Sequence, residues 1–354
     1  MMKKLKAGIL GATGTVGQKF VTLLREHPWF EVSALGASEI SAGQTYGQSV
    51  ASKWKQSAPV PPKIAAMRVR ECRPEIMDCD FVFSGLDAAV AGDIEKNFAA
   101  AGMPVISNTK NYRMEPDIPL LVPEVNPGHA ALIPLQKKRG WKGFIATNPN
   151  CVAVPLVMAL KPVLDEFGLS KVMVFSMQAI SGAGYPGVPS LDILDNIIPH
   201  IGGEEPKVET EPLKILGSLE RGKVRCADFA ISAQCNRVAV SDGHSLNVSF
   251  STRKKTSVAK IRKALENFTA LPQKLHLPSA PQRPLVYLDG DFRPQPRLDR
   301  GAGGGMTVSA GRLRECPVLG FKMALLGHNT IRGAAGAAIL NAELLFKLGY
   351  IKQR

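Results

Sequence analysis

The sequence predicts an α/β protein in which a doubly wound parallel sheet is followed by a second, mixed α+β domain. Three observations lead to this fold class. A glycine-rich turn joins a short apolar strand to a helix at the start of the chain, further apolar strands alternate with helices after it, and the pattern changes near residue 151. A chain of 354 residues also exceeds what one hydrophobic core usually organises, so two domains are expected.

The first domain is predicted from a strand, a turn and a helix in direct succession. Residues 6–10 form the apolar strand, residues 11–17 the glycine-rich turn, and residues 18–26 have the apolar spacing of an amphipathic helix. A second strand at 30–35 completes a βαβ unit, and two later segments are typical of buried strands: 81–85 and 104–107. We therefore expect a parallel sheet within residues 1–150.

The second domain is predicted from residue 151 onward. A long apolar helix comes first, and it is followed by a strand at 172–180 and further strands at 237–240 and 246–251. The proline-rich segment 275–296 is expected to be an ordered surface excursion. Residues 151–327 then form the second domain, and the alanine-rich helix at 330–348 packs back on the first, which residues 328–354 complete.

Composition restricts the partners of this chain. Its formal net charge of +14 favours anionic ligands, but the basic residues are scattered and form no stripe interleaved with aromatic residues, so we expect no nucleic-acid binding. No apolar run approaches the roughly 20 residues needed to cross a bilayer. Glycines and Lys19 cut short the apolar stretch that opens the chain like a secretory signal, so a cytoplasmic location is expected. The six cysteines show no C-x-x-C spacing, which in such a location predicts free thiols and no zinc ribbon, and no metal site is expected.

The glycine-rich turn predicts a dinucleotide-binding site of the Rossmann type. Gly11 permits the tight turn, Gly14 lets the backbone approach a pyrophosphate, and Gly17 lets the helix pack closely on the strand. The intervening residues Thr13, Thr15 and Val16 lie at the helix N-terminus, where free N–H groups favour an anion.

The residues after the second predicted strand bear on the choice of nucleotide. NAD would favour an acidic residue on the ribose diol, but the chain has Ala37 and Ser38 there, which leave room for a 2′-phosphate. NADP is therefore preferred, although Glu39 can either point away or bind a ribose hydroxyl.

Cys151 is the candidate nucleophile. It follows Asn148-Pro149-Asn150 and leads directly into an apolar helix with no acidic residue near its start. A sulfur at a helix N-terminus should have a lowered pKa and be present as a reactive thiolate. The other five cysteines are interpreted as small buried core residues.

Together these motifs resemble the aspartate-semialdehyde dehydrogenase family over nearly the full chain. The N-x-N-C motif follows an N-terminal G-A-T-G-x-V-G turn, and two further segments match in the family's order: 177–184 (MQAISGAG) and 236–244 (NRVAVSDGH). Residues 182–188 and 202–207 are more similar to the archaeal and fungal branch than to the common bacterial one.

The resemblance implies a role for each matching residue. Cys151, His244 and Gln178 would be catalytic, with His244 acting as acid and base because the pKa of histidine lies near neutrality. The substrate-binding set would bind the α-carboxylate, the ammonium and the phosphate, and orient the thioester: Arg237, Glu204, Lys207, Arg113 and Asn150. The cofactor-binding set would be Gly11, Thr13, Gly14, Thr15, Val16, Gly17, Ser38, Ser84, Gly182 and Asn329.

The reaction that the resemblance implies is the reversible conversion of L-aspartate 4-semialdehyde, NADP and phosphate into 4-aspartyl phosphate and NADPH, through a thioester and without a metal. The resemblance also implies that this reaction serves the biosynthesis of lysine, threonine and methionine. It further implies that the protein is a homodimer or tetramer. Relatives that reduce malonyl-CoA or N-acetylglutamyl phosphate are the nearest alternatives, and recognition of the free ammonium by Glu204 would separate them. A nucleotide-sensing regulator or a basic nucleic-acid-binding protein would need no such nucleophile.

Overall fold

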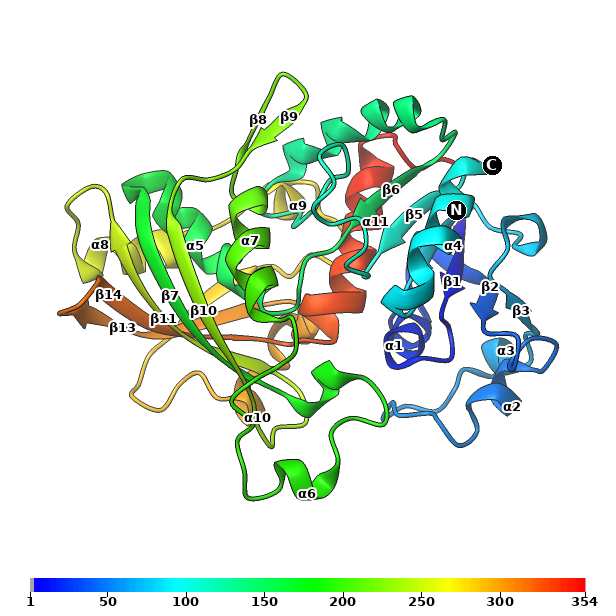
Figure 1. Cartoon of the computed structure of the whole chain (residues 1–354), viewed down its shortest axis with the longest axis horizontal. Helices are drawn as coiled ribbons and strands as arrows, with labels where there is room; N and C mark the ends of the chain where they lie inside the picture. The colour runs from blue at the N-terminus through cyan, green and yellow to red at the C-terminus, as the bar shows by residue number, and fades with distance from the viewer. Residues whose placement is uncertain (1–2, 354) are drawn as a thin grey trace.

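The computed structural model describes residues 3–353, so the outermost residues of the two predicted domains, 1–2 and 354, lie outside the described residues. Two sheets stand side by side, one built from the N-terminal half of the chain and the other from the C-terminal half (Figure 1). This arrangement confirms the predicted fold class.

The first sheet has six parallel strands in the order β3-β2-β1-β4-β5-β6. Its strands are β1 Leu5–Leu10, β2 Phe30–Ala37, β3 Val69–Glu71, β4 Phe81–Ser84, β5 Pro104–Ser107 and β6 Phe144–Thr147. β1 pairs with β2 on one side and with β4 on the other. The strand order therefore reverses beside β1, and in doubly wound sheets the ligand crevice lies at such a point.

Helices cover both faces of this sheet. They are α1 Thr15–Leu23, α2 Tyr46–Val50, α3 Pro62–Ala65, α4 Ala88–Ala100 and α11 Gly336–Lys347, with the 3-10 helical segments η1 Pro74–Ile76 and η2 Pro127–Arg139 and the π-helical segment η5 Ile331–Ala335. Ile339 and Leu345 of α11 share one core cluster with Phe30 and Phe81. The C-terminal helix therefore returns to the first domain, as predicted.

The second sheet is mixed and has the order β10-β7-β11-β14-β13-β12. Its strands are β7 Leu169–Gln178, β10 Ala230–Arg237, β11 His244–Thr252, β12 Leu285–Leu288, β13 Val308–Cys316 and β14 Gly320–Gly327. The pairs β7–β10 and β12–β13 are parallel, and the others are antiparallel. A separate hairpin, β8 Ser218–Glu220 and β9 Lys223–Arg225, projects from the top of the molecule in Figure 1.

The helices of the second domain pack mainly on one face of its sheet. They are α5 Ala153–Phe167, α6 Ser190–Ile193, α7 Glu205–Ile215, α8 Val258–Glu266, α9 Leu271–Lys274 and α10 Pro296–Asp299, with the turns η3 Ile180–Ala183 and η4 Ala302–Gly305. Apolar residues of α5 and α8 form one core with Val174 and Leu246. On β7, the side chains of Met173 and Phe175 remain 39% and 40% exposed, so the opposite face of the sheet is partly uncovered.

Two predictions for the second domain were wrong in detail, and one hairpin was missed. The strand predicted at 237–240 ends at Arg237 and begins at Ala230, because β10 is an edge strand whose outward positions are polar and lack an apolar run. Segment 275–296 is not only an excursion, since residues 285–288 form β12 at the other edge. The hairpin of β13 and β14 was not predicted, because charged residues on its exposed side interrupt the apolar alternation.

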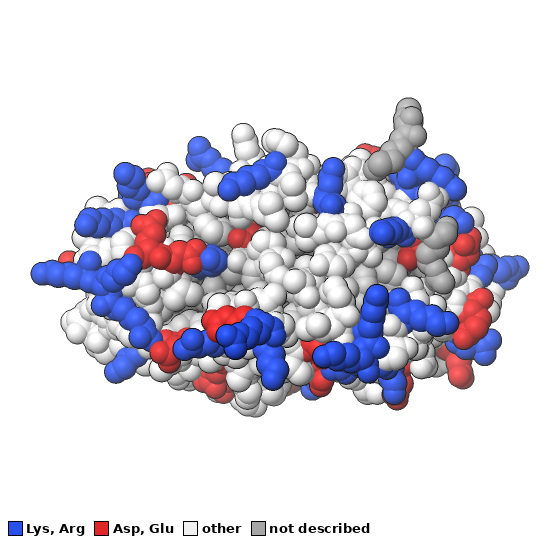
Figure 2. All heavy atoms as spheres, turned by 90° about the horizontal axis from the view of Figure 1, so that it is seen from above, with Lys and Arg blue, Asp and Glu red and all other residues white. Residues whose placement is uncertain are grey.

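The face of the molecule seen in Figure 2 carries scattered basic residues. Figure 2 shows Lys and Arg side chains spread over one face with Asp and Glu among them. Within residues 3–353, no helix is long and apolar enough to cross a membrane.

The strands of the first sheet all lie within residues 5–147 and those of the second within 169–327, while the domain boundary at 150 stays a prediction.

Candidate active site

The glycine-rich turn is shaped by its backbone. Gly11 has a φ of +74°, a conformation that side chains rarely adopt, and an added Cβ there would lie 2.7 Å from the carbonyl oxygen of Gly85. At Gly17 an added Cβ would lie 2.2 Å from the carbonyl oxygen of Gly11. α1 begins directly after Gly14 with no side-chain cap and no acidic residue in its first turn, so its first N–H groups are available to an anion.

These features fit a bound dinucleotide. Thr15 and Val16 line the same pocket as Cys151, and this pocket connects the turn with the second domain. Ser38 is exposed at the end of β2, next to buried Ala37. Thr13, Gly14 and Gly17 are not on the pocket wall.

Ser84 is placed differently from the other predicted cofactor residues. Its side chain is fully buried at the end of β4 and does not line the pocket. Its backbone carbonyl accepts hydrogen bonds from the backbone and the side chain of Asn108, which does line it. Any contact of Ser84 with a nucleotide would therefore be made by its backbone or through its neighbours.

Cys151 lies in the turn between β6 and α5, on the wall of a pocket of about 530 Å³. The Asn150 side chain accepts hydrogen bonds from the backbone N–H groups of Val152 and Ala153, at 2.8 and 3.3 Å. This contact caps the start of α5, as Asn does at many helix N-termini, and it fixes the backbone on both sides of the sulfur.

His244 is in contact with the sulfur of Cys151. Its Nε2 is 3.2 Å from Sγ of Cys151, and the ring is fully buried. The backbone N–H of Ala179 donates to Nδ1 at 3.0 Å. Because Nδ1 accepts this hydrogen bond, the neutral ring carries its proton on Nε2 and directs it at the sulfur.

Burial sets the protonation of this pair. Burial raises the pKa of Cys151 to about 12 and the charge of Glu204 acts in the same direction, whereas Arg113 and Arg237 lower it. This direction is opposite to the one predicted from the helix N-terminus. Burial also lowers the pKa of His244 to about 3, so the resting pair is a neutral thiol beside a neutral imidazole. Burial of the sulfur, reinforced by Glu204, therefore outweighs the effect of the helix N-terminus.

Glu204 is the centre of a hydrogen-bond cluster. Its Oε1 accepts from the side-chain amides of Asn150 at 2.7 Å and Gln178 at 3.3 Å, and its Oε2 is 3.0 Å from Nζ of Lys207. Although burial favours the neutral acid, Lys207 and the amide donors hold the pKa of Glu204 below its usual range. A buried anion at this wall of the pocket is suited to a cationic group of a ligand.

Arg237 lies at the end of β10, in register with Gln178 at the end of β7. Its Nη1 donates to the carbonyl of Ala179 at 2.8 Å, and the side chain lines the pocket. Gly182 lies close by: an added Cβ would lie 2.8 Å from Nη1 of Arg237 and 3.1 Å from Cε1 of His244. Gly182 thus provides the space that these two side chains need.

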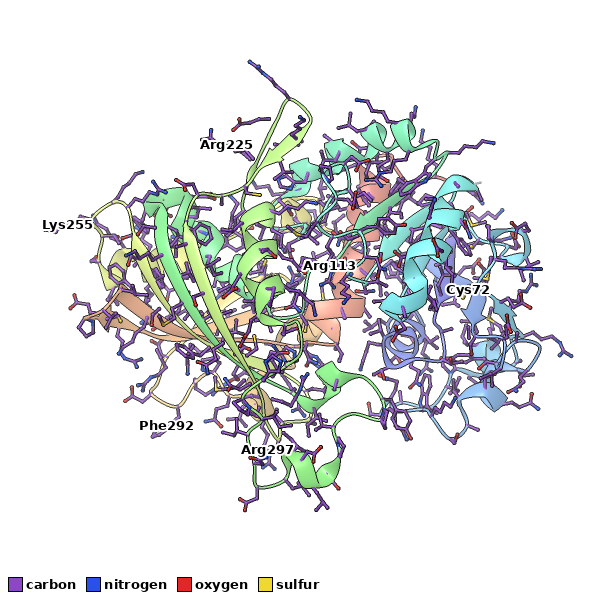
Figure 3. All side chains as sticks on the ribbon, viewed as in Figure 1. Cys72, Arg113, Arg225, Lys255, Phe292 and Arg297 are labelled. Carbon is purple, nitrogen blue, oxygen red and sulfur yellow. The ribbon has the colours of Figure 1, made fainter. Side chains whose placement is uncertain are left out.

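Arg113 and Lys207 bring two cations to the pocket wall. Arg113 reaches it from the loop after β5 and lies beside α7, as its label in Figure 3 shows. Asn329 also lines the pocket, but both ends of its amide are engaged: Oδ1 accepts from the N–H of Gly243 at 2.9 Å and Nδ2 donates to Ser181 at 2.8 Å. A ligand contact by Asn329 would have to compete with these bonds.

The predictions missed two residues beside the nucleophile. An added Cβ at Gly333 would lie 2.7 Å from Cβ of Cys151, so η5 can pass behind Cys151 only with glycine there. Glu211 accepts hydrogen bonds from Arg113 at 2.9 Å and from the N–H of Asn150 at 2.6 Å. A glycine within the helical segment 330–348 was the available signal for the first, whereas a glutamate inside α7 offered no signal.

Within residues 3–353, no group of three or more His, Cys, Asp or Glu side chains is placed to hold a metal ion. The site brings together one sulfur, one imidazole, amide donors and several cations, arranged between the glycine-rich turn and the second sheet.

Comparison with known families places each half of the chain. Residues 6–133 match the family described as semialdehyde dehydrogenase, NAD binding domain, and residues 160–332 match semialdehyde dehydrogenase, dimerisation domain.

Full-length relatives and solved structures agree with these matches. The chain is 50% identical to the aspartate-semialdehyde dehydrogenase of Archaeoglobus fulgidus over 97% of this chain and 98% of the relative, and 50% identical to that of Schizosaccharomyces pombe over 97% and 98%. The crystal structure of the Candida albicans aspartate semialdehyde dehydrogenase with NADP matches with a TM-score of 0.91 and 46% identity over 99% of this chain and 100% of that one. The Vibrio cholerae aspartate semialdehyde dehydrogenase II matches with a TM-score of 0.76 and 27% identity over 98% and 99%.

Proposed function

The chain belongs to the aspartate-semialdehyde dehydrogenase family, and on this premise we propose that it interconverts L-aspartate 4-semialdehyde and 4-aspartyl phosphate through a thioester on Cys151. The observation that carries the proposal is the 3.2 Å contact between the sulfur and His244 at a pocket lined by Arg237, Glu204 and Lys207. Nucleophile, hydrogen-bond donor and substrate-binding charges meet there.

NADP is the proposed cofactor. The turn at Gly11, Gly14 and Gly17 and the uncapped start of α1 would hold its phosphates, and exposed Ser38 beside small Ala37 leaves room for a 2′-phosphate. The similar Candida albicans enzyme has been solved with NADP. When bound, the nicotinamide supplies the two-electron acceptor or donor, as hydride.

Cys151 is the proposed nucleophile that carries the acyl group. In the oxidative direction its sulfur attacks the aldehyde carbon, and after oxidation the acyl group stays on the sulfur until phosphate attacks it and the thiolate departs. The Nε2–H of His244 stabilises the thiolate and the oxygen that becomes negative as sulfur bonds to carbon. The ring can take a second proton only if Nδ1 loses its contact with Ala179, so we assign proton transfer by His244 to states in which that contact has opened.

The substrate itself helps to ionise the sulfur. We assign the α-carboxylate to Arg237, which offers a planar pair of donors, and the ammonium to Glu204. The negative charge of Glu204 is one reason for the raised pKa of Cys151, so an ammonium bound there would reduce that effect. Substrate binding would therefore favour the thiolate when it is needed.

Phosphate is assigned to Lys207 and Arg113, two further cations of the pocket wall. Gln178 and Asn150 hold Glu204 in place and, we propose, orient the acyl group.

The assembly and location are also proposals. The exposed apolar residues Met173 and Phe175 on the second sheet would pack against another copy, which fits the family description of residues 160–332 as a dimerisation domain. We expect a homodimer, or a tetramer of such dimers, in the cytoplasm.

A spectrophotometric assay tests the function. Purified protein, aspartate semialdehyde and NADP should reduce the nucleotide, and phosphate should accelerate the reaction because it releases the thioester. Equal rates with and without phosphate would contradict the acyl-phosphate mechanism. No reduction under any of these conditions would point to another acyl substrate, such as malonyl-CoA.

A further inference from the structure

One face of α7 connects the two domains. Glu204, directly before the helix, and Lys207, in its first turn, line the pocket, and Glu211 and Lys214 follow at the spacing that keeps side chains on one side of a helix. Lys214 is buried, and its ammonium donates to three backbone carbonyls of the segment 113–118. α7 therefore holds the loop that carries Arg113.

Glu211 joins two parts of the active site. Its Oε1 accepts from Nη1 of Arg113 at 2.9 Å, and its Oε2 accepts from the backbone N–H of Asn150 at 2.6 Å. The side chain is only 2% exposed and does not line the pocket. One carboxylate thus touches an arginine of the pocket wall and the peptide directly before Cys151.

The guanidinium of Arg113 has donors to spare, because Glu211 and Asn108 engage two of its five N–H groups. Nη1 is bound by Glu211 and Nη2 donates to the carbonyl of Asn108 at 2.8 Å. Nε is buried and finds no hydrogen-bond partner among residues 3–353. Arg113 lies on the pocket wall, and Nη1 and Nη2 each carry a second N–H, so an anion entering the pocket can accept from this guanidinium.

We propose that Glu211 is a positioning residue that orients Arg113 toward the phosphate and fixes the Asn150 peptide, so that one carboxylate sets the placement of the phosphate relative to Cys151. The inference rests on the proposed function, because it takes phosphate as the ligand of Arg113. The pair is desolvated, so its geometry is strict: a buried arginine without its acidic partner turns toward other acceptors.

Substitutions at Glu211 separate this role from general support of the fold. Glu211→Gln retains the size of the side chain, but its amide nitrogen would face one of two donors and one contact would be lost. Glu211→Asp retains the charge on a shorter side chain. Glu209 offers a matched control, because its carboxylate on the same helix accepts from the N–H of Ala233, away from the pocket, and Glu209→Gln removes the same charge.

The measurements are the KM values for phosphate, semialdehyde and NADP, kcat, and calorimetric binding of inorganic phosphate to the enzyme without nucleotide. For E211Q we expect the KM and Kd for phosphate to rise on the order of tenfold, the size of one charged hydrogen bond. The KM for NADP should stay unchanged, kcat should fall, and E211D should show an intermediate rise in the phosphate constants. E209Q should match the wild type.

A double variant tests whether Glu211 acts through Arg113. If it does, E211Q adds no further rise in the phosphate constants once Arg113→Ala is present. Full additivity, or an equal change of all three KM values together with a lower melting temperature, would overturn the inference. If E211Q does not fold, a selective rise of the phosphate constants in E211D supports it and an unselective change overturns it. A wild-type enzyme that reduces NADP without any response to phosphate would instead overturn the proposed function.

Discussion

The two halves of the active site are built on different principles. The glycine-rich turn at residues 11–17 is contiguous in the sequence and acts through its backbone, with a positive φ at Gly11 and a close approach at Gly17. The cluster around Cys151 acts through side chains that lie far apart in the sequence. Its members come from the start of α5, the ends of β7 and β10, the start of β11 and the beginning of α7.

The register of the second sheet creates this cluster. Arg237 pairs with Gln178 where the parallel strands β10 and β7 end, and antiparallel β11 begins beside them at His244. The turn is therefore sensitive to any Cβ that would meet backbone atoms, whereas the cluster depends on each side chain and on the space around it. Substitutions in the two regions should therefore affect activity and stability in different ways.

The largest effect is expected for Cys151→Ser. The alcohol is a far weaker nucleophile than a thiolate, so NADP reduction should fall on the order of a thousandfold or more, while nucleotide affinity, held by the turn, stays unchanged. Steady-state rates and fluorescence titration with NADPH measure the two quantities. Cys226 is exposed and not buried as predicted, and it lies outside the pocket, so Cys226→Ser is the control and should leave both unchanged.

Gly182→Ala should damage activity with little loss of stability. The new Cβ would meet the end of the flexible Arg237 side chain, which can move, but the displaced guanidinium no longer holds the substrate. We expect kcat/KM for the semialdehyde to fall by about a hundredfold, the usual effect of a misplaced binding group. Gly128→Ala, where an added Cβ meets nothing, is the control. A melting temperature that falls in step with activity would show that Gly182 supports the fold instead.

Gly17→Ala, in contrast, should reduce the stability of the fold. The new Cβ would meet backbone atoms of Gly11 and Ala12, which cannot move without opening the turn. The free energy of unfolding should fall by about 2 kcal/mol or more, and the KM for NADP should rise. Urea unfolding and steady-state kinetics measure these effects. An unchanged KM for NADP in a folded G17A variant would separate the turn from cofactor binding.

The smallest effect concerns pH. His244 has a pKa lowered to about 3 in the folded chain, against 6.5 as its ordinary value, so the unfolded chain binds the proton first as the pH falls. Stability contributed by the neutral ring is therefore present above pH 6.5 and is lost as the pH falls toward 3. Between about pH 7.5 and 5.5, the unfolding free energy of the wild type should fall about 1 kcal/mol more than that of His244→Asn. If urea titrations show equal falls in the unfolding free energies of the two proteins, the buried ring must already be protonated in the folded chain.

The sequence was informative where local pattern decides the structure. The strand, turn and helix at the N-terminus and the returning C-terminal helix were predicted from spacing alone, although α1 begins at Thr15 and ends at Leu23, three residues earlier at each end than predicted. The family assignment came from short motifs around Cys151 and His244. Edge strands such as β10 and β12 were misjudged because their solvent-facing residues dilute the apolar signal.

The electrostatics of the site were not predictable from local sequence. The helix N-terminus suggested a lowered pKa for Cys151, but burial of the sulfur raises it, and Glu204, 53 positions further along the chain, adds to the rise. The tautomer of His244 likewise depends on the N–H of Ala179, which β7 brings next to β11. Such effects follow from tertiary contacts, and no spacing rule reports them.

Trapping the acyl group tests the central claim most directly. The protein would be mixed with aspartate semialdehyde and NADP without phosphate, quenched in acid, and mapped by peptide mass spectrometry. We predict one aspartyl group on the peptide that contains Cys151, formed together with NADPH and removed when phosphate is added before the quench. Formation of NADPH with the Cys151 peptide unmodified at every time point would contradict the account.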